Sequence, residues 1–188
     1  LNQCEVVAKL GLSLTKKGDI SVARAQILLS LSAVQATNGK LQEAEDNMEE
    51  AVSIFSKLMR KEKNATVLCN LSEIQIWQGK FTQAIRNTEK ALQLSRNTMF
   101  RSGEAHAHLS LGMVMNSLGL YERAIPHISE CLRISKESGL IDYRIPCQYL
   151  FAQVHTQLNN HKTSEKHIID GILMCEEGDP ERYLPSLR

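Results

Sequence analysis

The residues best spaced for chemistry are His127 and Cys131, which stand four positions apart. On a helix this spacing places both side chains on one face, where they could share a metal ion. A closed zinc site needs four ligands, and no second pair of this kind lies near in the sequence. We therefore interpret the pair as structural, and we predict no metal site and no cofactor.

Other catalytic patterns are missing from the sequence. It contains no nucleophile motif, no glycine-rich phosphate loop and no paired catalytic carboxylates. We predict that the chain is not an enzyme and that it has no catalytic residue.

Charge and cysteine usage narrow the partners and the compartment. Lys and Arg number 22 against 21 Asp and Glu, so no global field attracts nucleic acid or an anionic membrane. No apolar run is long enough to cross a bilayer. The five cysteines are odd in number, widely spaced and free of any C-x-x-C pair, which favours a reducing compartment. We expect an intracellular protein, cytoplasmic or nuclear, that binds neither nucleic acid nor membrane.

One stretch separates its charges by sign. Acidic residues crowd positions 43–50, and basic residues follow at Lys57, Arg60, Lys61 and Lys63. We expect both groups on one long helix, with the acids near its start and the bases near its end, as the helix dipole favours. A solvated outer face is our interpretation, and a steering patch for a partner is the alternative.

Self-similarity with a forty-residue period organises the chain. Gly39, Gly79 and Gly119 are each followed by a new apolar run, and Asn159 takes the fourth place. Gly and Asn tolerate the left-handed conformation that closes a helix C-terminus. The spacing predicts a turn at each of these four positions.

Small residues recur in fixed places on both sides of these turns, flanked by aliphatic ones. Close packing of two antiparallel helices needs small side chains at the contact and larger ones around it. The small positions are Ser32, Ser72, Gly112 and Ala152 before the turns, then Ala44, Ala84, Ala124 and Ser164, and then Ala51, Ala91, Cys131 and Gly171 after them.

Apolar residues follow the helical period within each segment. The pattern predicts helices over 22–38, 41–60, 64–78, 81–96, 102–118, 121–137, 143–158 and 161–177. The register also extends backwards, so 1–17 is expected to be the second helix of a truncated repeat. We expect 178–188 to be a tail or the start of the next repeat. The single solenoid of 1–188 would then comprise helix pairs over 22–60, 64–96, 102–137 and 143–177, cut from a longer protein.

These residues resemble the tetratricopeptide repeat family. The resemblance is carried by Leu71-Ser72 and Leu111-Gly112, by the turns Gly79-Lys80-Phe81 and Gly119-Leu120-Tyr121, and by Ala84, Ala124 and Ala91. The period resembles the long-repeat branch, which includes the Pins/LGN scaffolds, MalT and kinesin light chains. The resemblance implies an all-α fold: a right-handed solenoid of stacked antiparallel helix pairs, with about four full repeats after a leading half repeat.

The resemblance also implies a concave groove lined by the first helix of each pair, where a partner peptide or helix would bind. Carried over position by position, the residues expected to contact the partner are Asn70, Glu73, Trp77, His106, Ser110, Met113, Asn116, Tyr149 and Gln153, and the lining extends to Thr156 and Gln157. These positions hold no Lys or Arg, so we expect no clamp for a C-terminal carboxylate.

Two questions stay open at this point. Trp77 is either a contact for the partner or a filler between repeats, because tryptophan is enriched at both kinds of site. The chain is interpreted first as a scaffold for protein–protein interaction. The alternatives are a structural arm that contacts other subunits through its outer helices and ends, and a regulatory arm attached to an enzyme or NTPase domain elsewhere in the parent chain.

Overall fold

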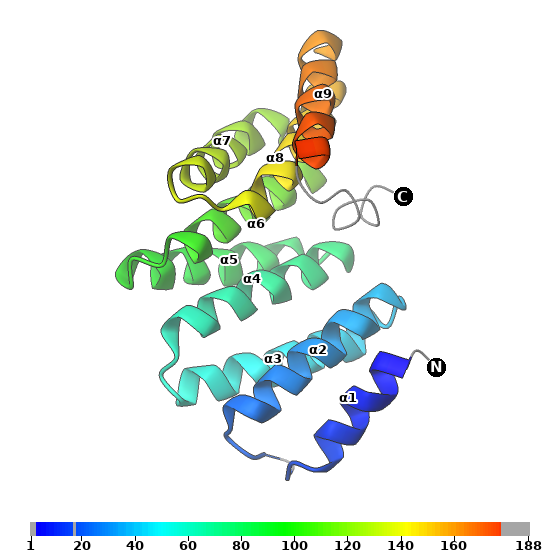
Figure 1. The fold of residues 1–188 in the computed structure, drawn as a ribbon, viewed down its shortest axis with the longest axis vertical. Coiled ribbons are helices and arrows are strands. Elements are labelled where there is room, and N and C mark those ends of the chain that lie inside the picture. Colours follow the sequence, from blue (N-terminus) through cyan, green and yellow to red (C-terminus); the bar gives the residue numbers. More distant parts are fainter. Residues whose placement is uncertain (1–2, 17, 178–188) are drawn as a thin grey trace. The chain divides into compact units, whose positions relative to one another are not determined.

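The computed structural model describes residues 3–16 and 18–177, and these form nine α-helices and no strand (Figure 1). The all-α fold predicted from the sequence is confirmed. The helices are α1 Gln3–Ser13, α2 Val22–Thr37, α3 Leu41–Lys57, α4 Lys61–Trp77, α5 Phe81–Asn97, α6 Arg101–Ser117, α7 Tyr121–Glu137, α8 Ile141–Gln157 and α9 His161–Glu177.

The chain divides into two compact units, Leu1–Gly103 and Glu104–Arg188, with the boundary inside the first turn of α6. In the first unit α1 packs on α2, α2 on α3, α3 on α4 and α4 on α5. In the second unit α7 packs on α8, and α8 packs on α9.

The helix lengths explain the forty-residue period. Each helix from α3 to α9 has 17 residues, and each connection from α2 onward has three. Two helices with their turns therefore occupy forty positions. Because a three-residue turn brings the chain straight back, consecutive helices within each unit run antiparallel.

The predicted turns are confirmed by their backbone angles. The φ values are +75° at Gly39 and Gly79, +72° at Gly119 and +57° at Asn159. In each turn the following residue donates its backbone N–H to a carbonyl five positions back, as in the 2.8 Å bond from Lys80 to Gln75. This pattern is the Schellman closure, and it satisfies carbonyls that the helix end leaves unpaired.

A second series of turns lies halfway between the first ones, at or next to places where the sequence predicted a break between helices but no left-handed residue. Met59, Met99 and Gly139 are forty positions apart and have φ values of +53°, +54° and +68°. Glycine adopts this conformation freely, whereas an L-residue with a Cβ loses about 1–2 kcal/mol there. Methionine gave no sequence signal for a left-handed turn, so these two positions were missed.

The small positions lie where neighbouring helices meet. Ala44, Ala84 and Ala124 are fully buried. A Cβ added to Gly112 would stand 2.8 Å from Ile128 and 3.2 Å from Leu150, so α6 has no room there for a larger residue. The predicted packing positions are confirmed for these residues.

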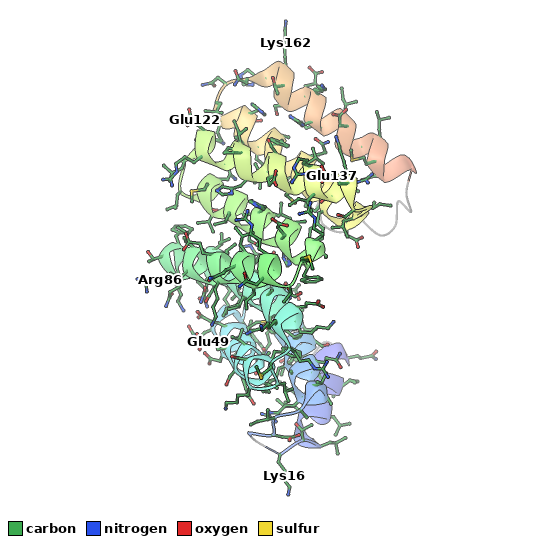
Figure 2. The ribbon with its side chains drawn as sticks, turned by 90° about the vertical axis from the view of Figure 1, so that its left-hand side faces the viewer. Lys16, Glu49, Arg86, Glu122, Glu137 and Lys162 are labelled. Carbon is green, nitrogen blue, oxygen red and sulfur yellow. The ribbon has the colours of Figure 1, made fainter. Side chains whose placement is uncertain are left out.

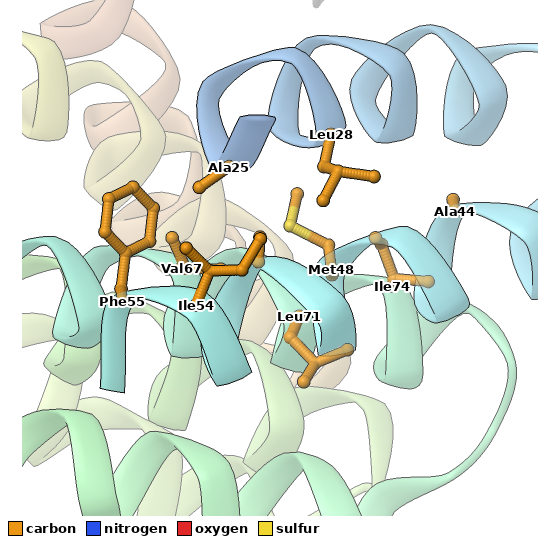
Figure 3. Close-up of a cluster of buried hydrophobic side chains, with 10 residues drawn as sticks. Ala25, Leu28, Ala44, Met48, Ile54, Phe55, Val67, Leu71 and Ile74 are labelled. Carbon is orange, nitrogen blue, oxygen red and sulfur yellow. The ribbon is translucent and has the colours of Figure 1, made fainter. Parts of the chain in front are cut away.

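The first unit has a continuous apolar core between its helices. Ten buried side chains form it, with Leu28 of α2, Met48 and Phe55 of α3 and Leu71 of α4 among them (Figure 3). Aliphatic side chains thus fill the space around the small contact positions, as the sequence pattern predicted.

Buried glutamates tie successive repeats of the first unit together. Glu45 is 3% exposed, pairs with Lys80 and accepts a 3.1 Å hydrogen bond from Gln75 Nε2. Burial raises the pKa of Glu45, but the hydrogen bonds from Lys80 and Gln75 outweigh it and the pKa is lowered. Forty positions earlier, Glu5 pairs with Lys40 at 3.0 Å and with Lys9 at 2.8 Å.

Some helix ends differ from the prediction. The helix expected over 41–60 ends at Lys57, and the next one begins at Lys61 instead of 64, because the unrecognised turn at Met59 lies between them. For the same reason the helix expected from 102 begins at Arg101, after Met99. The helix expected over 1–17 is described as Gln3–Ser13. The expected tail at 178–188 lies outside the described residues.

Replacing Ala124 with leucine tests the packing of α7. Ala124 is fully buried, so the larger side chain has no space, and we expect a loss of about 1–3 kcal/mol in the free energy of unfolding. Chemical denaturation measures this loss. Glu122→Leu is the matched control, because Glu122 is exposed on the same helix and projects away from the ribbon (Figure 2). Equal stability of both variants would contradict the packing.

The pairing of Glu5 predicts a dependence of stability on pH. Hydrogen bonds from Lys9 and Lys40 lower the pKa of Glu5 from 4.5 to about 2. Its contribution is therefore complete above pH 4.5 and is lost as the pH falls toward 2. We expect Glu5→Gln to be less stable than wild type above this window, and the difference to shrink within it. Urea unfolding across this range provides the measurement.

Glu49→Gln is the control for the Glu5 experiment, because Glu49 is exposed on α3 and forms no ion pair among the described residues. A stability difference between Glu5→Gln and wild type that does not change with pH would contradict the assignment.

Candidate functional site

An open pocket of about 430 Å³ lies in the second unit, and it is the main candidate site. Residues of four helices line it: Asn116 from α6, Tyr121 from α7, Tyr149, Ala152, Gln153, Thr156 and Gln157 from α8, and Ile168 from α9. A volume of this size accommodates a large side chain of a partner together with part of its backbone.

Helix α8 supplies most of the lining because of its sequence spacing. Tyr149, Gln153 and Gln157 recur every four residues, which places them along one face of a helix. Leu150 and Val154, each one residue further along, lie on an adjoining face, and their burial holds the helix in the core. The polar face is therefore directed to the pocket by the same periodicity that fixes the fold.

Hydrogen bonds join the polar groups at the pocket. Asn116 Nδ2 donates to Gln153 Oε1 at 3.3 Å, and Gln153 Nε2 donates to the Tyr149 hydroxyl at 2.8 Å. Tyr121 reaches Gln157 Oε1 at 3.5 Å. The amides are thus held in place, while the Tyr149 hydroxyl keeps its own proton available for an acceptor.

The lining carries no charge and no group that transfers protons near neutral pH. It offers amides, hydroxyls and aromatic rings beside Ala152 and Ile168. Such a surface can hydrogen-bond the backbone of a peptide and cover an apolar side chain. A charged ligand would find no counter-ion there.

An apolar ledge on α9 extends the pocket. A smaller hollow of about 90 Å³ shares Tyr149, Ala152 and Ile168 with the pocket and continues along Ile172 and Cys175 of α9. Tyr149 is 53% exposed and Ile168 51% exposed, so both present apolar surface to solvent. Together the two hollows form a surface that is polar along α8 and apolar along α9.

Stacked rings hold α9 against α8 beside this ledge, and one of them, His167, also lines the smaller hollow. The His167 ring stacks on Phe151 with centroids 4.6 Å apart and on His155 at 5.5 Å. His167 Nδ1 also lies 2.6 Å from Gln148 Oε1. Burial, with a smaller contribution from His155, lowers the pKa of His167, which favours the neutral ring in this stack.

The structure brings together three of the predicted site residues, Asn116, Tyr149 and Gln153. The other three predicted residues of this unit lie on α6 outside the pocket lining. His106 is half-buried with its ring 5.6 Å from that of Tyr143, and Met113 is half-buried. Ser110 is fully buried, so a partner cannot reach it without a rearrangement.

The remaining predicted residues, Asn70, Glu73 and Trp77, lie on α4 in the first unit. Asn70 and Glu73 are half-buried. Trp77 is 55% exposed, so it does not act as a core filler within the described part of the chain. Of the two interpretations that the sequence left open, exposure favours a contact surface at Trp77.

Three lining residues, Tyr121, Ala152 and Ile168, were not predicted to line the groove. Ala152 was predicted as a small packing position. Tyr121 and Ile168 lie on second helices of their pairs, which the family resemblance places outside the groove. Tyr121 is the first residue of α7, so its long side chain extends past the turn, and its hydroxyl reaches α8. Its aromatic type directly after the Gly119 turn is the only sequence signal that could have identified it.

The pair His127 and Cys131 has structural surroundings. Cys131 is fully buried, and His127 Nδ1 lies 3.3 Å from His108 Nδ1 of α6. A hydrogen bond with Cys147 of α8 holds the pKa of Cys131 below its ordinary value. Among the residues that the structure describes, no group of three His, Cys, Asp or Glu side chains is placed to hold a metal ion.

Comparison with known proteins gives one sequence match. A sequence model of the tetratricopeptide repeat matches residues 23–97 and 63–137, which together span more than half of the chain. No match to the chain was found among the curated proteins. None of the described helices is long and apolar enough to cross a membrane.

Several solved structures share the fold at low identity. Aspartyl phosphate phosphatase F from Bacillus subtilis is 16% identical with a TM-score of 0.74, over 88% of this chain and 43% of that one. BtubC from P. vanneervenii is 18% identical with a TM-score of 0.69, over 93% and 73% of the two chains. A putative kinesin light chain from Podosopora anserina is 15% identical with a TM-score of 0.66, over 93% and 84%. The chain spans less than half the length of the phosphatase.

Proposed function

We propose that this chain, which belongs to the tetratricopeptide repeat family, is a non-catalytic scaffold that binds a partner protein through a peptide or helix. The binding site is the pocket of the second unit, with Tyr149 and Gln153 at its centre. A single observation carries the proposal: Asn116, Gln153 and Tyr149 form a hydrogen-bonded chain along an open, uncharged pocket.

The polar part of the pocket fits the backbone of a peptide. An extended peptide, or the first or last turn of a helix, presents N–H and C=O groups that need partners when water is removed. The Tyr149 hydroxyl can donate to a carbonyl, and the amides of Asn116 and Gln157 offer further donors and acceptors. Because two of the pocket's amides already bond within the pocket, little conformational entropy is lost on binding.

The apolar part fits a side chain of that peptide. Tyr149, Ile168 and Ile172 each expose about half of their surface, and covering them removes apolar area from water. A neutral lining also disfavours a ligand that depends on charge, such as a terminal carboxylate. The partner segment is therefore an internal peptide or helix that carries at least one aliphatic or aromatic residue.

Trp77 of the first unit is proposed as a separate contact for a protein partner. It is half exposed beside Glu73 on α4, and tryptophan is among the residues that contribute most at protein interfaces.

We also propose an intracellular location, cytoplasmic or nuclear. The free thiols of Cys69, Cys131, Cys147 and Cys175 are consistent with a reducing compartment.

A second candidate function is a structural arm that is covered by neighbouring chains or repeats. One specific observation favours it: the first and last described helices expose apolar rows. Val7 and Leu10 of α1 are 68% and 61% exposed, and Ile169 and Leu173 of α9 are each 49% exposed. Such rows are ordinary contact surfaces in stacked helical repeats.

Peptide display distinguishes the two functions. A library of random peptides is selected on the wild-type chain and then tested against the variant Tyr149→Arg/Gln153→Arg, which places unpaired cations in the neutral pocket. We expect the selected peptides to lose affinity by roughly tenfold or more for the variant. Circular dichroism confirms that the variant stays folded.

Ser129→Arg is the matched control, because Ser129 is exposed on α7 outside the pocket lining. Selected peptides should bind this control as they bind wild type. Peptides that bind all three proteins equally would contradict the pocket as the site and favour contacts through the ends.

A further inference from the structure

The turn between α3 and α4 in the first unit concentrates positive charge. Lys57, Arg60, Lys61 and Lys63 surround it, and Glu62 is the one acid in this stretch. All five side chains are exposed. Among the described residues, none of the four cations takes part in an ion pair, whereas other cations of the same unit do, including Arg24, Lys40 and Lys80.

The N-terminus of α4 adds partial positive charge to this turn. The sequence predicted all four cations at the C-terminal end of one long helix. This is confirmed for Lys57, which lies in the last turn of α3, and is wrong for Lys61 and Lys63. Helix α4 begins at Lys61, so Lys61 and Lys63 lie at its N-terminus, and no side chain caps it. The helix dipole places partial positive charge at this end, and the lysines add charge of the same sign. Glu62 in the same turn offsets one of these charges, and the four cations leave the turn with a net positive charge.

Two exposed methionines lie in this turn and in the turn that follows α5. Met59 is 78% exposed and Met99 is 85% exposed, and both have a left-handed backbone. The equivalent place in the second unit holds Gly139, which adopts this conformation without strain. Folding therefore favours glycine at these places, and it does not account for a large apolar side chain in water. Methionine is common at surfaces that bind peptides, because its flexible thioether adapts to different side chains.

The two turns adjoin each other around one notch. An open hollow of about 420 Å³ is lined by Met59, Arg60, Lys61, Glu62 and Lys63 on one side and by Thr98, the neighbour of Met99, on the other. Cationic and apolar groups thus lie within reach of a single bound segment.

We propose that this surface, the Met59–Lys63 notch, binds an acidic peptide segment of a protein partner, with an aliphatic side chain of that segment packed on Met59 and its carboxylates beside Arg60, Lys61 and Lys63. The surface lies in the first unit and is independent of the pocket in the second unit. Its occupant is defined by charge complementarity and by the exposed methionines.

The surroundings favour a short peptide over a membrane or a nucleic acid. The four clustered cations lie within positions 57–63, and the acidic residues Glu43, Asp46 and Glu49 are exposed further back on α3, with Glu49 projecting outward in Figure 2. An extended polyanion or a flat anionic surface would meet these carboxylates and be repelled. A short segment can occupy the notch without reaching them.

Fluorescence anisotropy with defined probes tests the proposal on the whole chain. The probe is a fluorescein-labelled peptide of repeated Glu-Glu-Leu, and the comparison peptides are repeated Glu-Glu-Ser and Lys-Lys-Leu. We expect saturable binding of the Glu-Glu-Leu peptide, weaker binding of the Glu-Glu-Ser peptide and none of the Lys-Lys-Leu peptide. Binding should weaken as the salt concentration rises, because exposed charges are screened.

Two variants separate the charge from the methionine. Lys61→Glu/Lys63→Glu should reduce affinity for the Glu-Glu-Leu peptide by about tenfold. Met59→Gly should also reduce it, while the melting temperature stays equal or rises because the left-handed strain is relieved. Lys90→Glu is the control for the charge change, since Lys90 is exposed on α5 outside the notch. This control should bind like wild type.

Other occupants are outcomes of the same experiment. Equal affinity of wild type and Lys61→Glu/Lys63→Glu would overturn the proposal. So would binding of phosphatidylserine vesicles or labelled single-stranded DNA without binding of the Glu-Glu-Leu peptide. Concentration-dependent dimers in sedimentation velocity, abolished by Lys61→Glu/Lys63→Glu in a protein that does not bind the peptide, would assign the notch to a second copy and overturn it as well.

Discussion

Close approach of antiparallel helices is the constraint on which the rest of this structure depends. A 17-residue helix must end, reverse within three residues and return against its predecessor. The reversal requires one residue in the left-handed conformation, and the return requires small side chains such as Ala84 and Ala124 at the contact. Neither requirement suffices alone, because a tight turn with bulky contacts would force the helices apart.

This constraint also determines where function can lie. Positions that face a neighbouring helix are fixed by packing, so the surface left for partners consists of the remaining helix faces and the turns. The two sites proposed here occupy one of each kind. The pocket in the second unit uses the polar face of α8, and the notch in the first unit uses a turn whose backbone would accept glycine more readily than Met59.

The electrostatic arrangement follows the same division. In the first unit the buried carboxylates of Glu5 and Glu45 are paired with lysines of the next repeat, because an unpaired charge at those positions would be costly. Charges on the turn at Lys61 are under no such requirement and remain unpaired among the described residues. A paired charge stabilises the fold, whereas an unpaired one remains available to a partner.

The sequence predicted the fold closely because its signals are local and repeated. The residue type of Gly39, Gly79 and Gly119 predicts a turn at each position, and the small positions recur without a gap. The residue type of Met59 and Met99 predicts no turn, because methionine has no preference for turns. The helix boundaries around these two residues were misplaced as a result. The fold therefore follows from residue type wherever the residue is specialised for its conformation.

The site was predicted less completely. Asn116, Tyr149 and Gln153 line one pocket, whereas Ser110 is buried and Tyr121 was missed. Helical periodicity says which face of a helix is polar, but it does not say how deeply each residue lies between its neighbours. Ser110 is small enough to be enclosed by adjacent helices, and Tyr121 is long enough to reach across a turn, so only the three-dimensional arrangement decides their exposure.

Site-specific photo-crosslinking tests the central claim most directly, namely that the pocket of the second unit binds a partner protein. A photoreactive phenylalanine derivative replaces Tyr149 in one protein and Lys136, which is exposed at the end of α7, in another. Both proteins are expressed in cells and irradiated, and the crosslinked peptides are identified by mass spectrometry. The account predicts a defined partner peptide joined at position 149 and none at position 136. Crosslinks at position 136 with none at position 149 would contradict it.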